Sequence, residues 1–415
     1  MSVAYESRFA SLNRVLSRRG PFSAEHFAPG QEAADALKLC KLLVIGAGGL
    51  GCELLKDLAL AGFTDLHVID MDTIDVSNLN RQFLFRRTDV GKAKAEVAAA
   101  FVQRRVPTCK ITPHVGRIQD KDDDFYRSFT MIVCGLDSVE ARRWINAKIF
   151  ELLDDDDDDS LKIMIDGGTE GFRGHARVII PMHTACYECT IDLIPPQTRF
   201  PICTIANTPR LPEHCIEWAA VIEWPRVFPA KKIDGDDPDH IRWIATKAGE
   251  RAAAHGIDGV NYALAQGVVK NIIPAIASTN AVIAAACAAE AVKLATHCNP
   301  YIEDYMMFNG GGGIYSLVIA NEKRSDCPIC GEASTVHSAK ISATSTVADF
   351  IDWLRAEPKF QLRRPSITGN GRTIFMQAPP SLNEATKPNL ERLLSELAPD
   401  GTVLTITDPG LALSL

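Results

Sequence analysis

The feature that most constrains this 415-residue chain is a glycine-rich segment directly after an apolar run. Residues 42–45, Leu-Leu-Val-Ile, have the character of a buried strand, and helix-forming residues begin at Glu53. The residues between include four glycines: Gly46, Gly48, Gly49 and Gly51. A glycine-rich turn between a strand and a helix lets backbone N–H groups approach a phosphate, and the helix N-terminus adds partial positive charge. We therefore predict an α/β, Rossmann-like domain with a nucleotide site.

Carboxylates and cations downstream narrow the choice of nucleotide. Asp70 closes the next strand-like run at a spacing that suits a contact to ribose hydroxyls. Asp137 closes a later run, 131–137, at the edge where doubly wound sheets bind ligands, and is placed to hold Mg²⁺. Arg81 and Lys94 lie between them. An ATP that is attacked at its α-phosphate needs such cations to neutralise its phosphates and hold the leaving pyrophosphate.

Two alternatives remain open on the residues alone. The glycine pattern also fits a nicotinamide-dependent oxidoreductase, which would need little charge beyond the helix dipole and would not depend on ATP. Taken singly, Arg81 and Lys94 could be solvated helix charges, and Asp137 could be a helix cap. A chance match of short motifs is much less plausible for the whole set than for any one of them.

Several motifs in order resemble the adenylation domain of ubiquitin-like modifier-activating enzymes, which bacterial sulfur-carrier adenylyltransferases share. They are 46–51, 70–72, 78–82, Lys94 and 135–137, and the resemblance covers most of residues 37–330. In that family the residues matching Asp70, Asn78, Arg81, Lys94 and Asp137 contact ribose, phosphates and Mg²⁺. The resemblance implies an ATP and Mg²⁺ site at these residues: Gly46, Gly48, Gly49, Gly51, Asp70, Asp72, Asn78, Arg81, Gln82, Lys94 and Asp137.

Two C-x₂-C pairs predict a structural zinc. The pairs are Cys186 with Cys189 and Cys327 with Cys330. Four thiolates suit a tetrahedral Zn²⁺, which here would join segments remote in sequence. The alternative is two unrelated pairs of buried thiols, but the family resemblance also implies zinc at this place.

Between the two pairs, Cys203 is the predicted nucleophile. It lies in a proline-flanked segment, 200–212, that we expect to be loop-like, and loops on a rigid scaffold often present catalytic groups. In the resembled family the matching Cys-Thr forms a thioester with the modifier's C-terminal glycine, a reaction suited to a thiol. The competitor is Cys215, next to His214, but neighbours in sequence point in different directions on a helix. We interpret Cys215 as a partly buried helix residue.

Composition agrees with an intracellular enzyme. The net charge of −8 gives no support for nucleic-acid binding. The first eight residues lack the apolar core of a signal peptide. The most apolar long stretch, 274–296, contains Asn280, Glu290 and Lys293 and is predicted to be a buried, alanine-rich helix with no membrane role. We expect a protein of the cytoplasm and nucleus, whose cysteines are thiols or metal ligands.

The chain is too long for one ordinary domain. After Cys330 we predict a helix over 346–354, a hairpin over 366–376, a helix over 388–398 and a strand over 402–407. By resemblance this is a ubiquitin-like β-grasp domain that recruits a conjugating enzyme. The predicted segments are a helical lead-in (1–36), an adenylation domain (37–202), an inserted, mostly helical catalytic-cysteine domain (203–267), the rest of the adenylation domain with the zinc clip (268–330), a linker (331–340) and the β-grasp domain (341–415).

Within the family, segments 68–85, 200–215 and 234–240 resemble the catalytic subunits of neddylation-activating enzymes. This resemblance implies ATP-dependent adenylation of a ubiquitin-like modifier at its C-terminal glycine, a thioester on Cys203 and transfer to a conjugating enzyme. The alternative is the catalytic subunit of a SUMO-activating enzyme, whose cysteine segment and tail are usually longer. A catalytically silent scaffold is a third hypothesis, but the presence of both Asp137 and Cys203 opposes it.

Two further expectations concern partners. The family often carries an Arg-Tyr-x-Arg-Gln element before the glycine loop, and nothing before Lys41 matches it. This departure predicts a heterodimer in which a regulatory, pseudo-symmetric adenylation subunit supplies the arginine in trans. In the resembled branch, the arginine matching Arg177 faces the modifier's tail, where a cation would repel a tail that carries arginine. The alternative is an exposed strand arginine without that role.

Overall fold

The computed structural model describes residues 8–154, 156–193, 202–229, 231–235, 237–269, 275–301, 305–331, 341–342, 344–357, 360, 362–369, 372–399 and 401–408. The chain divides into two compact units, one formed by Met1–Ile194 with Ala275–Leu415 and the other by Pro195–Pro274. The second unit contains the predicted range 203–267, whose exact limits stay a prediction. Nearly all of the predicted linker, 331–340, lies outside the described residues.

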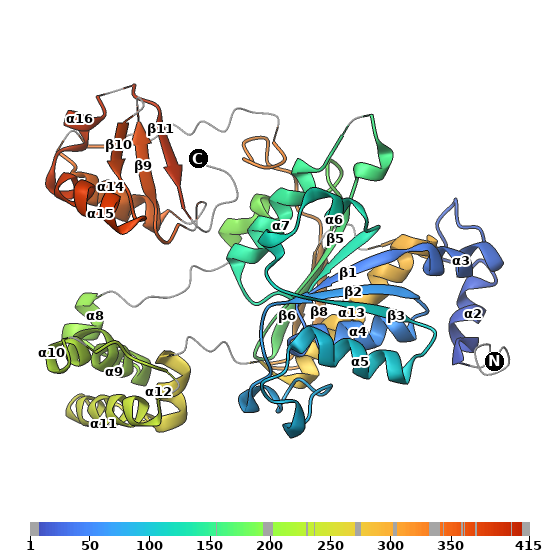
Figure 1. The fold of residues 1–415 in the computed structure, drawn as a ribbon, viewed down its shortest axis with the longest axis horizontal. Helices are drawn as coiled ribbons and strands as arrows, with labels where there is room; N and C mark the ends of the chain where they lie inside the picture. The colour runs from blue at the N-terminus through green and yellow to red at the C-terminus, as the bar shows by residue number, and fades with distance from the viewer. Residues whose placement is uncertain are drawn as a thin grey trace. The chain divides into compact units, whose positions relative to one another are not determined.

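The first unit is built on an eight-stranded sheet with the order β3-β2-β1-β4-β5-β6-β7-β8 (Figure 1). The first five strands in this order, β3 to β5, are parallel to their neighbours. The remaining pairs, from β5 to β8, are antiparallel. The strands are β1 (Lys41–Ile45), β2 (Asp65–Asp70), β3 (Lys110–Val115), β4 (Met131–Cys134), β5 (Ile163–Glu170), β6 (Arg173–Ile179), β7 (Tyr305–Asn309) and β8 (Tyr315–Ile319). The prediction of a Rossmann-like α/β fold is confirmed.

Strand β1 shows why the sequence forms a buried parallel strand. Successive side chains of a strand point to opposite faces, so both faces must be covered if every residue is apolar. Leu42 and Val44 pack into the core under helices α4 (Gly49–Leu60), α5 (Lys94–Arg105) and α13 (Ala277–Thr296). Leu43 and Ile45 pack into the opposite core. Each of these four side chains is at most 1% exposed, and such burial contributes about 1.5–3 kcal/mol per residue.

The opposite core lies on the face covered by α6 (Asp123–Arg127) and α7 (Val139–Glu151). Tyr126 of α6 and Ile145 and Ile149 of α7 are buried in it. Figure 1 shows the two groups of helices on the two sides of the sheet. The helix predicted over 274–296 is confirmed as α13, which begins at Ala277.

The order of the strands creates a switch point between β1 and β4. The chain runs outward from β1 through β2 to β3 and then returns to the other side of β1 as β4. The loops that follow β1 and β4 therefore leave the same edge of the sheet in opposite directions, which opens a ligand crevice there. Gly46 N donates to Ile69 O at 2.9 Å, and Gly135 N donates to Ile45 O at 2.8 Å, so the three strand ends are tied together at this edge.

Before the sheet, the described part of the lead-in contains α2 (Ala10–Leu16) and α3 (Gln31–Leu39). The expected helical character is confirmed there, although α3 continues three residues beyond the predicted limit at 36. No helix among the described residues is both long enough and apolar enough to cross a membrane.

All of the regular elements in the described residues of the unit Pro195–Pro274 are helical, in agreement with the predicted mostly helical domain. Its elements are α8 (Ile202–Asn207), α9 (Pro212–Glu217), a π-helical segment η6 (Trp218–Glu223), α10 (Trp224–Val227), α11 (Pro238–Ala254) and α12 (Tyr262–Val269). Its own core includes Ile216, Trp224, Ile241 and Ile244. The expectation of a loop around Cys203 is wrong, because α8 already begins at Ile202.

The C-terminal residues form a small α+β fold. Helix α14 (Val347–Ala356) packs on a three-stranded antiparallel sheet of order β10-β9-β11. The strands are β9 (Ser366–Gly369), β10 (Arg372–Phe375) and β11 (Leu404–Thr407), which confirms the predicted hairpin and last strand. Their turn at 370–371 lies outside the described residues.

The single helix predicted over 388–398 is wrong. The chain forms α15 (Pro380–Thr386), a 3₁₀ turn η7 (Lys387–Glu391) and the short α16 (Leu394–Leu397). Helix geometry is interrupted because Leu393 forms a β-bridge with Thr346, and Leu394 N donates to Ser345 O at 2.9 Å. A tertiary backbone pairing thus overrides the local helix preference.

Candidate functional site

The glycine loop packs so tightly that side chains are excluded from it. Gly46 has φ 97°, a conformation that favours glycine, and a Cβ there would lie 2.7 Å from Gly135 O. A Cβ on Gly51 would lie 2.0 Å from Gly46 O. The loop therefore folds back against its own helix and against the segment after β4. This packing explains Gly46 and Gly51 without reference to a ligand.

The start of α4 provides the anion-binding feature. The helix begins at Gly49, four residues before the predicted start at Glu53, so the motif supplies its first turn. Gly48 precedes the helix and has no side chain that could accept from the first N–H groups. A phosphate oxygen can take that place, where the helix dipole also favours negative charge.

Asp70, Asp72 and Lys94 form a connected group beside the loop. Asp70 Oδ2 accepts from Ala47 N and Asp70 Oδ1 accepts from Asp72 N, both at 2.7 Å. Burial raises the pKa of Asp70, and these two N–H groups oppose the shift. Lys94 Nζ lies 2.8 Å from Asp72 Oδ2 although the lysine side chain is only 10% exposed. The cation predicted from sequence is therefore held beside the loop by an ion pair.

The 78–82 motif approaches the loop from the other side. Asn78 ends the 3₁₀ turn η1 (Val76–Asn78), where its Oδ1 accepts from Asp75 N at 3.0 Å. Arg81 is partly exposed, and its Cγ would lie 3.5 Å from a Cβ on Gly49. Gln82 is 3% exposed beside Gly48, and its Oε1 has no hydrogen-bond partner among the described residues. These placements agree with a nucleotide site.

Asp137 lies at the switch point, although not on a strand. Strand β4 ends at Cys134, so the run predicted to reach Asp137 stops three residues earlier. Asp137 is exposed in the short segment before Ser138, which caps α7 by accepting from Ala141 N at 3.1 Å. The cap is therefore Ser138, and the Asp137 carboxylate stays accessible to a ligand.

A buried ion pair that sequence reasoning missed lies under this segment. Arg142 Nε donates to Asp166 Oδ1 at 2.9 Å, and its Nη2 donates to Gly167 O at 2.9 Å and to Leu136 O. Asp166 is fully buried. Burial alone would raise the pKa of Asp166, but the Arg142 and His175 side chains outweigh it and lower the pKa to about 2. The pair links α7 and β5 to the backbone beside Asp137.

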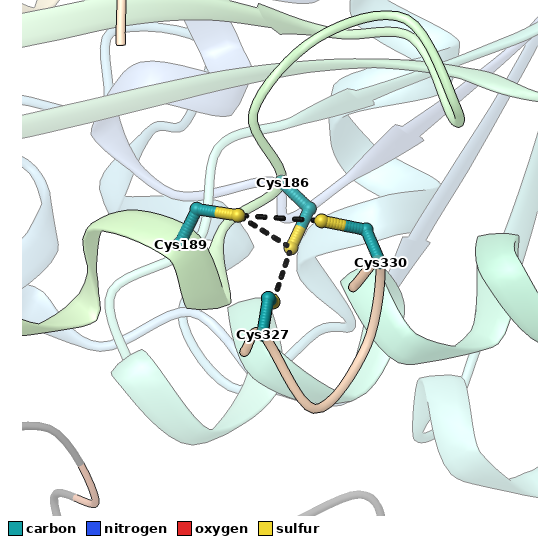
Figure 2. Close-up of side chains that lie close together, drawn as sticks. All are labelled: Cys186, Cys189, Cys327 and Cys330. Carbon is teal, nitrogen blue, oxygen red and sulfur yellow. Dashed lines mark hydrogen bonds between the residues drawn. The ribbon is translucent and has the colours of Figure 1, made fainter. Parts of the chain in front are cut away.

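The four paired cysteines meet, as predicted. All are buried, and their sulfur atoms lie within 4.8 Å of one another (Figure 2). The Sγ–Sγ distances are 3.8 Å for Cys186–Cys189, 3.5 Å for Cys186–Cys327 and 3.3 Å for Cys189–Cys330. A tetrahedral zinc with Zn–S near ~2.3 Å requires sulfur separations of about 3.8 Å. The cluster is compatible with that ion, and no other such donor group occurs among the described residues.

Arg177 lies on a strand, as predicted, and its side chain is buried. It is on β6 but only 1% exposed, so the description as an exposed strand arginine is wrong. Its Nη1 donates to Thr190 Oγ1 at 2.9 Å, and its Nη2 donates to Cys186 O at 3.3 Å. The guanidinium also lies 5.4 Å from the ring centre of Tyr305. In this conformation the cation faces the cysteine cluster, and a selectivity role gains no support from its position.

The second unit separates the two candidate nucleophiles. Cys203 is the second residue of α8, whose C-terminal carbonyl oxygens of Ile205 and Ala206 accept from Arg251 Nη2. Cys215 is fully buried in the core of this unit, and burial raises its pKa. The interpretation of Cys215 as a buried helix residue is confirmed, which leaves Cys203 as the candidate.

Two family models match the chain over its length. The ThiF family model covers residues 24–329, which include the glycine loop, Lys94, Asp137 and three of the four paired cysteines, and Cys330 follows directly after its end. The chain belongs to the ThiF family. The model of the E2 binding domain covers residues 340–415, the small α+β fold. The ubiquitin-like assignment of this fold is thereby confirmed.

Curated relatives of this ThiF-family chain identify its branch. It is 52% identical over 419 residues to the Drosophila melanogaster Nedd8-activating enzyme E1 catalytic subunit, covering 98% of this chain and 93% of the relative. The Dictyostelium discoideum and Caenorhabditis elegans proteins of that name are each 48% identical, and the alignments cover 99% and 98% of this chain and 96% of each relative. The resemblance to the neddylation-activating branch is confirmed, and the SUMO-activating alternative is not favoured.

Proposed function

We propose that this chain is the catalytic subunit of an enzyme that activates a ubiquitin-like modifier of the NEDD8 type with ATP. The observation that carries the proposal is that the chain combines the glycine-loop site with similarity to NEDD8-activating catalytic subunits along nearly its whole length. Fold similarity alone would not distinguish this activity from other uses of a nucleotide site.

In the first step a carboxylate oxygen of the modifier's C-terminal glycine attacks the α-phosphorus of ATP, and pyrophosphate leaves. The N-terminus of α4 binds the phosphate oxygens, and Lys94 and Arg81 neutralise the charge that develops on the leaving group. Asp70 accepts from Ala47 N in the glycine loop and from Asp72 N after β2, so it fixes the loop while its remaining lone pairs can accept from the ribose hydroxyls.

Asp137 fits a magnesium ligand. It is an exposed carboxylate at the switch point, and Mg²⁺ is commonly held by one or two carboxylates together with substrate phosphates. When bound, Mg²⁺ would supply charge neutralisation on the phosphates. Asp72 is released from Lys94 once a phosphate takes the lysine, and so becomes available as a second acceptor at the same site.

In the second step the Cys203 thiolate attacks the acyl carbonyl, and AMP leaves with the bonding electron pair. The resulting thioester is then exchanged onto a cysteine of a conjugating enzyme, which we propose the 340–415 domain binds. In the described structure Cys203 is the second residue of the short helix α8.

The cysteine cluster acts in structure only. Cys186, Cys189, Cys327 and Cys330 would hold Zn²⁺ and join the segment after β6 to the segment after β8. We also propose a heterodimer with a pseudo-symmetric regulatory subunit, which would supply a phosphate-binding arginine in trans, in the cytoplasm and nucleus.

A non-reducing gel tests the function. The chain is incubated with its partner subunit, Mg²⁺, ATP and either a NEDD8-type modifier or ubiquitin. We expect an ATP-dependent adduct with the NEDD8-type modifier that a thiol reductant removes. Cys203→Ala should abolish the adduct, and Cys215→Ala is the matched control, because it removes a thiol from the same unit and should leave the adduct intact. An adduct that survives in Cys203→Ala would refute the assignment.

A further inference from the structure

The start of α13 lies against the glycine loop and is held there by its neighbours. Thr279 Oγ1 donates to Gly171 O at 2.8 Å, and Gly171 forms a β-bridge with Ala275. These contacts tie the first turn of α13 to the turn between β5 and β6. Asn280, the next residue, is therefore positioned by these two contacts with Gly171.

The orientation of the Asn280 amide is fixed as well. Thr169 Oγ1 donates to Asn280 Oδ1 at 2.6 Å, so the amide oxygen faces β5. The amide nitrogen then faces the loop, where it would lie 2.4 Å from a Cβ on Gly49. The same Cβ would lie 3.5 Å from Arg81 Cγ. Asn280 and Arg81 thus flank the first residue of α4.

This amide nitrogen lacks a partner. Asn280 is 2% exposed, and its Nδ2 has no hydrogen-bond partner among the described residues. A buried donor without an acceptor is costly, and native structures retain few of them. An unpaired buried donor beside a loop suited to anions indicates that an acceptor on a ligand completes its hydrogen bonding.

We infer that Asn280 is a substrate-binding residue, whose amide nitrogen donates to an anionic oxygen of the ligand over Gly49. The inference rests on the proposed function and adds a residue to its site. Two substrates offer such an oxygen: the phosphates of ATP and the C-terminal carboxylate of the modifier. Both are attracted by Arg81, and each would satisfy the same buried donor.

The test uses three variants of the full chain in its heterodimer. Asn280→Leu removes the donor, and Asn280→Asp keeps both the shape and the bond from Thr169 but replaces the donor by an acceptor. Thr279→Val is the matched control, because it removes a hydrogen bond from the adjacent buried residue without touching the donor. The measurements are the Kd for ATP by calorimetry, the KM for the modifier in ATP–pyrophosphate exchange, and the thermal midpoint.

For wild type we expect measurable ATP binding and exchange; their absence would defeat the proposed function itself. Loss of a hydrogen bond to a charged group should weaken binding about tenfold or more in both Asn280 variants. A raised Kd for ATP identifies a phosphate as the acceptor, and an unchanged Kd with a raised KM for the modifier identifies the carboxylate. The inference is overturned if Asn280→Asp changes neither the Kd for ATP nor the KM for the modifier by more than about twofold. It is also overturned if Thr279→Val weakens binding as much as Asn280→Asp does.

Discussion

Asp166→Asn should strongly destabilise the adenylation domain, although it replaces only one carboxylate oxygen by an amide nitrogen. Asp166 is fully buried and paired with Arg142, so the variant leaves a buried guanidinium without its counter-charge. Removal of one partner from a buried ion pair costs about 3–5 kcal/mol. The pKa of Asp166 gives a consistent figure: a shift from 3.8 to about 2 corresponds to about 2.5 kcal/mol in favour of the ionised form.

The assay is the thermal midpoint of the ligand-free protein. A loss of about 3 kcal/mol in the free energy of unfolding should lower the midpoint by about 6–12 °C for a domain of this size. Asp123→Asn is the control: it breaks the pair with Lys148, but Asp123 is 46% exposed, so the expected loss is at most about 1 kcal/mol. If Asp166→Asn moves the midpoint no further than Asp123→Asn, the pair does not stabilise the fold as argued.

The same pair predicts a dependence on pH. Because the pKa of Asp166 is lower in the folded protein, its stabilisation is fully present above the unfolded value of 3.8 and is lost as the pH falls through about 2. The gap in stability between wild type and Asp166→Asn should therefore stay constant from about pH 7 down to about pH 5 and narrow only in stronger acid. A gap that closes near neutral pH would show that another group controls it.

Three further predictions follow from the site. Asp137→Ala should abolish ATP–pyrophosphate exchange, whereas Cys203→Ala should retain exchange without forming a thioester; exchange lost in an intact Cys203→Ala protein would overturn the division of roles. Cys327→Ser should lower both the zinc content and the thermal midpoint, because it opens a link between distant segments; elemental analysis that finds no zinc in wild type would exclude the metal. Arg177→Gln should lower the midpoint by removing buried hydrogen bonds near Cys186, and thioester rates with a NEDD8-type modifier and ubiquitin should keep their ratio; a relaxed preference would instead restore the selectivity role expected from sequence.

The nucleotide half was predictable because its signals are local. An apolar run, glycines and a following carboxylate specify a strand, a tight turn and a ligand without reference to distant residues. The predicted strand and Asp70 fall where the structure has β1 and the end of β2. Even so, the start of α4 was misjudged, because glycine is a poor helix former and Gly49 and Gly51 are helical only through packing against Gly46 and Asn280.

Contacts between distant segments were not predictable from one sequence. Nothing near Arg142 in the chain indicates Asp166, and nothing near Asn280 indicates Gly49. The strand position of Arg177 was predicted correctly, but its burial was not, because the contact of its guanidinium with the Cys186 backbone joins segments whose packing the sequence does not show. The paired cysteines are the exception, because metal chemistry imposes a spacing that can be recognised in each half separately.

The cysteine cluster also holds together two segments that are far apart in the sequence. Cys186 and Cys327 are 141 positions apart, and β6 pairs with β7 across nearly the same interval. The unit Pro195–Pro274 is therefore inserted into a stretch of chain whose two ends are held together by the cysteine cluster and by strand hydrogen bonds. A single backbone cleavage within Pro195–Pro274 would leave the two parts of the adenylation domain held to each other. Evolution can consequently lengthen or replace the helical unit while the nucleotide site keeps its shape.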